Sequence, residues 1–220
     1  MPRAEWLPVV LAAGRSCRMG TPKLALAHGG VAVLATTVEA VRRAVGRSPL
    51  VVAPASGPVW ALTSELGVVA ALNGDPGRGL SHSLVIAARA AGRRGLLVFL
   101  GDEPEISEAA VAAVVAEVAR WPEASLVAPR FRGEVPGHPV YVARSLLAGV
   151  DRLTGDQGAR ALAAGLPPER VRTVWVDEFP PGDLDTPADW ERFQRQRLRP
   201  PAESRGRPMG VNRGGESRGR

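Results

Sequence analysis

The sequence predicts an α/β fold of three layers, α/β/α, in which helices cover both faces of a mostly parallel central sheet. Two observations carry this prediction. Short apolar segments with the composition of strands alternate along the chain with segments of helical spacing. The apolar segments are continuous runs of Val, Leu and Ala without polar alternation, which indicates strands that are buried on both sides.

The expected strands occupy residues 7–12, 49–54, 67–72, 96–100, 125–129, 139–142 and 171–176. The run LLVFL at 96–100 has the clearest strand pattern. The expected helices occupy about 31–45, 59–66, 80–91, 109–119 and 158–164. Ser107 is a suitable N-cap for the fourth helix, and Thr186 followed by Pro187 opens a last one.

Composition excludes several classes of protein. The chain has 220 residues, of which 45% are hydrophobic and 23% charged, as in ordinary globular proteins. A membrane helix needs roughly 18 or more consecutive apolar residues, and the sequence has no such run. The single cysteine, Cys17, allows no internal disulfide and fits a reducing compartment, so we expect a cytoplasmic protein.

The net charge of +6 has an uneven distribution along the chain. Residues 197–220 hold seven arginines and two glutamates, which leaves a net charge of only +1 for residues 1–196. We therefore expect one folded domain over 1–196 and a disordered Arg/Gly/Pro-rich tail over 197–220. Nucleic-acid binding through this tail remains an alternative function, but the nearly neutral body argues against it.

Lysine is nearly absent from the chain. Of the 28 basic residues, 27 are arginine, and Lys23 is the one lysine. An ammonium is a compact point charge that the planar guanidinium of arginine does not imitate at a tight phosphate site. Lys23 closes a loop that follows the first expected strand, which makes it a candidate phosphate ligand.

That loop, AAGRSCRMGTPK, is neither a Walker A loop nor a GxGxxG turn. Its glycines and small residues still allow backbone N–H groups to approach an anion, and Arg18 and Lys23 add positive charge. Two further polar loops, 73–83 and 101–104, also follow strands. Ligands of parallel α/β sheets bind beyond the carboxyl ends of the strands, so we expect the three loops to form one site.

The segment LAAGxSxRMGxPKL at residues 11–24 resembles the N-terminal signature of MobA-like nucleotidyltransferases. This group has the Rossmann-like, glycosyltransferase-A-like fold and includes the sugar and isoprenoid nucleotidyltransferases. The resemblance implies that Arg18 and Lys23 are catalytic residues that hold the triphosphate. It also implies a nucleotide-binding turn made by Leu11, Ala12, Ala13 and Gly14.

Later segments continue the resemblance. The stretch from Asn73 to Ser83 resembles the family's N…GxxxSL segment, although Pro76 stands where an aromatic residue is common, and it implies that both residues bind nucleotide. The turn GDEP implies Mg²⁺ on Asp102, a third catalytic residue, and the closing motif DLDTPAD implies Asp185 as a second metal ligand.

Simpler roles remain open for these positions. Asp102 can be a turn residue that caps its own backbone, and Ser83 can belong to the start of a helix. Asp185 or Thr186 can cap the last helix. We expect Asp183 to be solvated.

The segments GHP at 137–139 and GDQGAR at 155–160 resemble the cytidylyltransferase branch for molybdenum cofactor. They imply that His138, Asp156 and Arg160 bind the acceptor. For His138, packing or substrate contact is favoured over proton transfer, because no Ser or Cys partner is evident. Asp156 and Arg160 can alternatively form an i,i+4 pair on a helix surface.

The resemblance implies transfer of CMP from CTP to the phosphate of a molybdopterin-type molybdenum cofactor, with Mg²⁺ as cofactor and release of pyrophosphate. It further implies a molybdoenzyme of the xanthine dehydrogenase type as partner. The sequence LAAG is typical of the CTP-using branch, whereas LAGG is typical of the GTP-using one. Alternatives are a GTP-dependent guanylyltransferase, another NTP transferase acting on a sugar or small-molecule phosphate, and a non-catalytic cofactor carrier.

Overall fold

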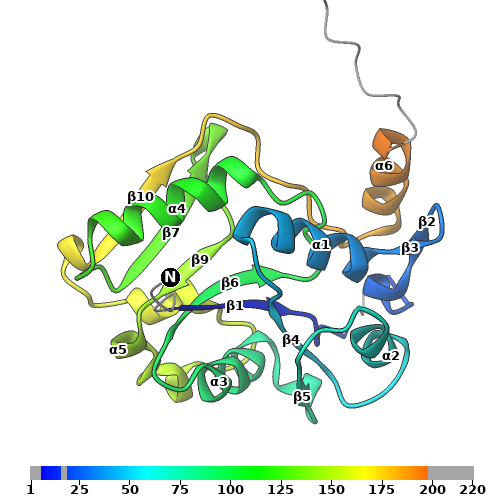
Figure 1. Ribbon diagram of the computed structural model, residues 1–220, viewed down its shortest axis with the longest axis horizontal. Helices are drawn as coiled ribbons and strands as arrows, with labels where there is room; N and C mark the ends of the chain where they lie inside the picture. Colours follow the sequence, from blue (N-terminus) through cyan, green and yellow to red (C-terminus); the bar gives the residue numbers. More distant parts are fainter. Residues whose placement is uncertain (1–5, 16–18, 198–220) are drawn as a thin grey trace, which may run out of the picture.

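A mixed sheet organises the chain, and the computed structural model describes residues 6–15 and 19–197 of it (Figure 1). In the described part the sheet has eight strands, in the order β10-β7-β9-β6-β1-β4-β5, with β8 paired to β7. The strands are β1 (Trp6–Leu11), β4 (Leu50–Pro54), β5 (Ala70–Asn73), β6 (Gly95–Leu100), β7 (Leu126–Phe131), β8 (Val135–Pro136), β9 (Val140–Val142) and β10 (Val171–Trp175).

The sheet is mostly parallel, as the sequence predicts. Strand β1 pairs in parallel with both β4 and β6, and β4 with β5 and β7 with β10 are also parallel. Strand β9 is inserted antiparallel between β6 and β7, and β8 is antiparallel to β7. A separate hairpin consists of β2 (Ala27–His28) and β3 (Val31–Ala32).

Helices cover both faces of this sheet. The α-helices are α1 (Val33–Val45), α2 (Pro58–Glu65), α3 (Leu80–Ala91), α4 (Glu108–Arg120), α5 (Arg144–Leu147) and α6 (Pro187–Arg197). Figure 1 shows α1 and α4 on one side of the sheet, and α3 and α5 on the other. Short 3-10 turns are η1 (Lys23–Ala25), η2 (Pro76–Arg78), η3 (Arg132–Glu134), η4 (Val150–Arg152), η5 (Ala159–Ala163) and η6 (Pro168–Arg170).

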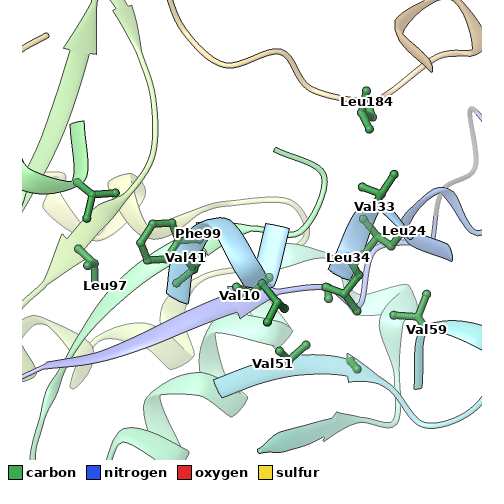
Figure 2. Packing of buried hydrophobic residues seen from close by; sticks show 14 of the residues in the cluster. Val10, Leu24, Val33, Leu34, Val41, Val51, Val59, Leu97, Phe99 and Leu184 are labelled. Atoms are coloured by element: carbon green, nitrogen blue, oxygen red, sulfur yellow. The ribbon is translucent and has the colours of Figure 1, made fainter. Parts of the chain in front are cut away.

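The continuous apolar strands supply two separate cores. Val10 and Phe99 lie in the core beneath α1, α2 and α4, which Figure 2 shows from close by. Their neighbours Val9 and Val98 point to the opposite face and pack with residues of α3. Since side chains alternate along a strand, only an unbroken apolar run can fill both cores, so the predicted three-layer arrangement is confirmed.

Local sequence also fixes several element boundaries. Helix α3 has the predicted bounds, and the Oγ of Ser107 accepts a hydrogen bond from the N–H of Ala110, as an N-cap does. Two predictions need correction. The strand expected at 67–72 begins only at Ala70 and lies at the sheet edge, where Leu72 is 51% exposed. The helix expected at 158–164 is the shorter 3-10 turn η5.

Helix α6 starts with a capping box. The Oγ1 of Thr186 accepts from the N–H of Asp189, whose carboxylate accepts from the N–H of Thr186 at 2.8 Å. Thr186 is therefore the cap, which leaves Asp185 outside that role. Trp190 and Phe193 of α6 make ring contacts with His28 of the hairpin, so α6 docks where the chain has just left the Lys23 loop. In the described residues no helix is long and apolar enough to cross a membrane.

Candidate active site

A pocket of about 610 Å³ opens at the carboxyl ends of β1 and β6, next to the loop that follows β5. This volume is within the range of small-molecule sites. The loops that follow these three strands all contribute to it, as predicted, and so does the segment that precedes α6. The lining residues are Leu11, Ala13, Gly14, Arg15, Lys23, Leu24, Pro76, Gly77, Gly79, Leu80, Ser83, Leu100, Asp102, Asp156, Asp183 and Asp185.

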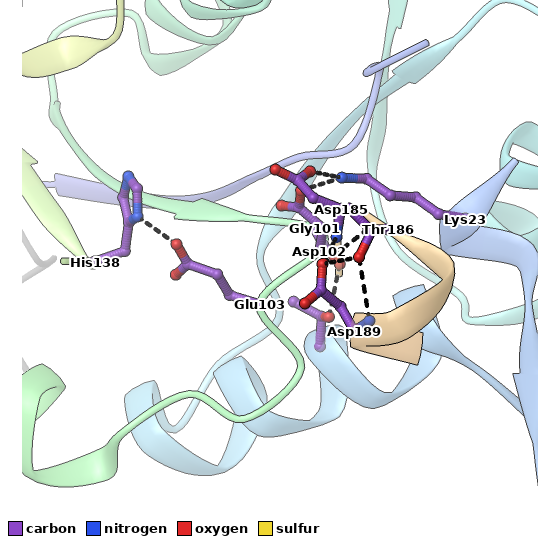
Figure 3. Close-up of polar contacts among 9 residues, drawn as sticks. Lys23, Gly101, Asp102, Glu103, His138, Asp185, Thr186 and Asp189 are labelled. Carbon is purple, nitrogen blue, oxygen red and sulfur yellow. Dashed lines mark hydrogen bonds and ion pairs between the residues drawn. The ribbon is translucent and has the colours of Figure 1, made fainter. Parts of the chain in front are cut away.

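Lys23 contacts both of the predicted metal ligands. Its Nζ lies 2.5 Å from Oδ2 of Asp102 and 2.8 Å from Oδ1 of Asp185 (Figure 3). The lysine side chain is only 11% exposed, and the carboxylates are 21% and 29% exposed. Burial lowers the pKa of Lys23, but the charges and hydrogen bonds of Asp102 and Asp185 outweigh it and raise that pKa above its ordinary value.

The close approach of two strands fixes the position of Asp102. Gly101 donates its N–H to the carbonyl of Leu11 at 2.9 Å, and a Cβ at Gly101 would lie 3.1 Å from that oxygen. The Oγ1 of Thr37 donates to the Gly101 carbonyl at 2.8 Å. A glycine is therefore favoured where β6 ends, and the following carboxylate is held at the mouth of the pocket.

The segment before α6 brings Asp185 to the same place. The N–H of Leu184 donates to the carbonyl of Asp102 at 3.2 Å, and the Leu184 side chain is buried in the core. Asp183, just before it, was expected to be solvated. It is exposed but also lines the pocket, where partial burial and the charges of Glu103, Asp102 and Asp185 raise the pKa of Asp183 to about 6.

Three residues of the predicted nucleotide-binding turn contribute to the pocket. Leu11, Ala13 and Gly14 line the pocket directly, whereas Ala12 is 1% exposed and donates its N–H to the Val52 carbonyl. Arg18, together with Cys17, lies outside the described residues.

A buried pair connects the end of β5 with α3. The Nδ2 of Asn73 donates to the Oγ of Ser83 at 3.0 Å, and the two residues are 0% and 4% exposed. The structure thus brings together two positions that the sequence singled out ten residues apart. Ser83 faces the pocket and Asn73 holds it from behind.

Asp156 belongs to the start of α3. Its Oδ1 accepts from the N–H of Leu80 at 3.3 Å, and the carbonyl of Gly155 accepts from the N–H of Ser81 at 3.0 Å. Gly79 has φ of +81°, and any Cβ there would overlap the Gly155 carbonyl. The alternative of an i,i+4 pair with Arg160 on one helix is therefore wrong, because Asp156 contacts the start of α3 and only Arg160 belongs to the 3-10 turn η5.

A second charged cluster lies beside the pocket. The Nδ1 of His138 is 2.7 Å from Oε1 of Glu103, whose side chain is only 8% exposed (Figure 3). Arg160 donates to the carbonyl of Gly137. Burial lowers the pKa of the Arg160 guanidinium, and the negative charge of Glu103 opposes this effect. Sequence reasoning missed Glu103, although a glutamate inside a strand-end turn that also holds Asp102 was a visible signal.

The donor set fits a hard divalent cation. Asp102 and Asp185 converge on one cationic atom, which shows that their oxygens can share a positive charge. In the described ranges, no group of three or more His, Cys, Asp and Glu side chains is arranged to hold a metal ion. Magnesium is commonly held by one or two carboxylates and by substrate phosphates, so two protein ligands suffice for that chemistry.

Several known proteins are similar to this chain in sequence and fold. Rv0371c from Mycobacterium tuberculosis H37Rv is 30% identical, with a TM-score of 0.73 over 89% of this chain and 100% of that one. Its complex with manganese is also similar, with 29% identity, 86% and 97% coverage and a TM-score of 0.67. The purine catabolism protein PucB of Bacillus subtilis is 29% identical over 85% of this chain and 95% of its own length.

The family profile described as "MobA-like NTP transferase domain" matches residues 8–171, which include Lys23 and Asp102. Since this match spans well over half of the 220 residues, the chain belongs to the MobA-like NTP transferase family.

Proposed function

We propose that this nucleotidyltransferase moves CMP from CTP to the phosphate of a molybdopterin-type molybdenum cofactor and releases pyrophosphate. The observation that carries the proposal is the group of Lys23, Asp102 and Asp185 at the mouth of a pocket large enough for a nucleotide. It combines an ammonium for phosphates with two carboxylates for a divalent cation.

Different residues of the chain are assigned to different parts of the bound nucleoside triphosphate. Lys23 binds the β- and γ-phosphates and stabilises the charge of the departing pyrophosphate, and the backbone at Ala13 and Gly14 contacts the nucleotide. Asp102 and Asp185 hold Mg²⁺, which supplies neutralising charge at the α-phosphate when it is bound. Arg18 is assigned to the triphosphate on the resemblance of its motif.

The acceptor is assigned to the side of the pocket where the Glu103–His138 pair and Arg160 lie. A phosphate acceptor is already anionic, so attack on the α-phosphorus needs no general base. It needs alignment and screening of like charges, which a guanidinium next to the pocket can provide. His138 then contacts the acceptor and does not transfer a proton. Asp156 orders the start of α3 and stays a candidate acceptor contact.

The choice of CTP rests on the turn at the end of β1. Ala13 is only 4% exposed and lines the pocket, so its methyl group narrows the floor on which a base would lie. The same position is glycine in the LAGG pattern of the GTP-using branch. A narrower floor favours a pyrimidine over a purine.

The partner is proposed to be a molybdoenzyme of the xanthine dehydrogenase type. The relative PucB bears a name from purine catabolism, and xanthine is a purine. A cytosine dinucleotide cofactor made here would pass to such an enzyme.

Pyrophosphate release tests the proposal. The purified protein is incubated with Mg²⁺, molybdenum cofactor and each of the four nucleoside triphosphates in separate reactions. We expect release with CTP that depends on both the acceptor and the metal. Release with GTP but not with CTP would overturn the proposed nucleotide. Release with CTP only when another phosphate acceptor is added would overturn the proposed acceptor.

A further inference from the structure

The side chain of Lys23 occupies the space between the two carboxylates that are proposed to hold the divalent cation. Its Nζ lies 2.5 Å from Oδ2 of Asp102 and 2.8 Å from Oδ1 of Asp185. Lys23 is also the residue proposed to bind the triphosphate. The ammonium of Lys23 is therefore assigned both to the two carboxylates and to the triphosphate, and it cannot bind them at the same time.

Lysine and metal exclude one another at this position. Magnesium binds carboxylate oxygens at about 2.0–2.1 Å, closer than the ammonium of Lys23 lies to the same oxygens. A divalent ion on both carboxylates would lie close to Nζ, and the two cations would repel each other strongly, since the lysine side chain is only 11% exposed. Occupation of the site by a metal therefore requires that Nζ leave.

The surroundings allow the side chain to move while the ligands stay. Lys23 accepts from the N–H of Leu26 at 3.1 Å, so its backbone is tied into η1, while its four-carbon stem retains rotamers. The N–H of Asp185 donates to Asp189 at 3.3 Å, within the cap of the docked helix α6. Lys23 lines the pocket together with Ala13 and Gly14, where the triphosphate would lie.

We propose that Lys23 is the resident counter-ion of the metal site, and that it moves from the two carboxylates to the triphosphate when nucleotide binds. The inference rests on the proposed nucleotidyl-transfer function and adds an order to it. Metal alone binds weakly, because it must displace Lys23 from two ion pairs without offering the ammonium a new anion. Nucleotide supplies that anion, so metal and nucleotide each strengthen the binding of the other.

Binding of Mn²⁺ without nucleotide tests this directly, with electron paramagnetic resonance of the free ion as the readout. Lys23→Met is expected to bind Mn²⁺ at least tenfold more tightly than the wild type. Arg15→Met removes the same charge from the same pocket lining and serves as the matched control, with a change below threefold. Equal or weaker binding by Lys23→Met, or an equal gain in Arg15→Met, would overturn the proposal.

The wild-type chain offers a second test that needs no variant. Since Lys23 is the one lysine among 220 residues, lysine labelled with ¹³C at Cε gives one side-chain resonance. Mg²⁺ is titrated alone, with CTP and, in a parallel sample, with GTP. We expect the resonance to move whenever metal occupies the site. With a bound nucleotide, the Mg²⁺ concentration that causes this movement should be at least tenfold lower than without nucleotide. A metal-occupied site with an unmoved resonance would contradict the exchange.

The two proposals fail in different ways. The manganese experiment includes neither nucleotide nor acceptor, so a protein that uses GTP or another acceptor would still show the tenfold effect of Lys23→Met. Conversely, CTP-dependent pyrophosphate release with unchanged Mn²⁺ affinity in Lys23→Met would leave the proposed function standing and remove the exchange.

Discussion

The two sides of the site handle charge in different ways. Around Lys23 the charged groups line an open pocket and are paired with one another through their side chains. Around Glu103 the groups are tied into the fold, since His138 lies on a carboxylate that is 8% exposed and Arg160 donates to a backbone carbonyl. The first arrangement can exchange its partners for ligands, whereas the second holds its groups before any ligand arrives.

Because of this difference, substitutions in the two regions should have different effects on stability, ligand binding and turnover. Changes on the Lys23 side should affect ligand binding and turnover with little loss of stability. Changes on the Glu103 side should lower the stability of the fold and should also weaken binding of the acceptor. Five experiments, from the largest expected effect to the smallest, separate the two regions.

Lys23→Ala is expected to have the largest effect. Loss of a preorganised charge from the transition state commonly costs about 10²–10³-fold in turnover, and Lys23 is the one described cation that contacts both candidate metal ligands. We expect pyrophosphate release near background. Deletion of residues 198–220, beyond the end of α6, is expected to leave turnover within about twofold. The opposite pattern would contradict the division into a catalytic body and a dispensable tail.

Asp102→Asn is expected to lower turnover by about 10²-fold, because it removes a charged ligand at the α-phosphate. Asp185→Asn should have a similar but smaller effect, and addition of EDTA to the wild type should abolish activity. The thermal midpoints of both variants should remain close to that of the wild type. Full activity in Asp102→Asn would exclude metal-assisted transfer through this residue.

Glu103→Gln should act on the acceptor and leave the nucleotide unaffected. It keeps an oxygen for His138 but removes the charge that strengthens this contact, so His138 is held less firmly toward the acceptor. KM for the acceptor should therefore rise roughly tenfold, equal to about 1.4 kcal/mol, while KM for CTP stays constant. Glu103→Ala should in addition destabilise the fold by about 2–3 kcal/mol, since it leaves buried polar groups without their partner. Steady-state kinetics and denaturant unfolding check the two effects separately, and a rise in both KM values would refute the assignment.

Two glycines sharpen the comparison between the regions. A Cβ at Gly137 would overlap the ring of the buried Phe131, so Gly137→Ala should cost about 1–3 kcal/mol of unfolding free energy. A Cβ at Gly14 meets no described atom within 4 Å, so Gly14→Ala should keep its thermal midpoint and lose nucleotide affinity. If the two variants were equally stable, the tight packing proposed for the acceptor side would be wrong.

The raised pKa of Asp183 should make the stability of the fold weakly dependent on pH. Its pKa in the fold is raised from 3.8 to about 6, so the folded protein disfavours the charged form. The resulting destabilisation is absent below about pH 4, grows as the pH rises through 6 and is complete above it. Asp183→Asn should therefore be more stable than the wild type at pH 7–8, by about 1 kcal/mol or less because the group is exposed, and equally stable at pH 3.5. Thermal unfolding across this range would show no trend if the side chain were simply solvated.

Much of the fold is encoded locally and could be predicted. Helix α3 and the buried strands follow from apolar periodicity, and the cap at Ser107 follows from residue type. Lys23 stood out because it is a lysine among arginines, and its loop follows a strand. The limits of β5 could not be predicted, because an edge strand buries less apolar surface and leaves a weaker pattern.

The long-range pairings of the site could not be read from the sequence. Lys23 and Asp185 are 162 positions apart, and only the return of the chain to α6 brings them together. Glu103 pairs with His138, which the antiparallel strand β9 brings next to it from 35 positions further along the chain. Strand direction depends on how the whole sheet assembles, and composition does not encode it.

The identity of the product is the most direct test of the central claim. Molybdenum cofactor is incubated with the wild-type protein, Mg²⁺ and an equimolar mixture of CTP and GTP, and the released cofactor is analysed by mass spectrometry. We expect the wild type to release a cofactor that has gained one CMP unit, and Lys23→Ala to release a cofactor without this gain. A cofactor that carries GMP, or one left unchanged while the protein is folded and binds nucleotide, would contradict it.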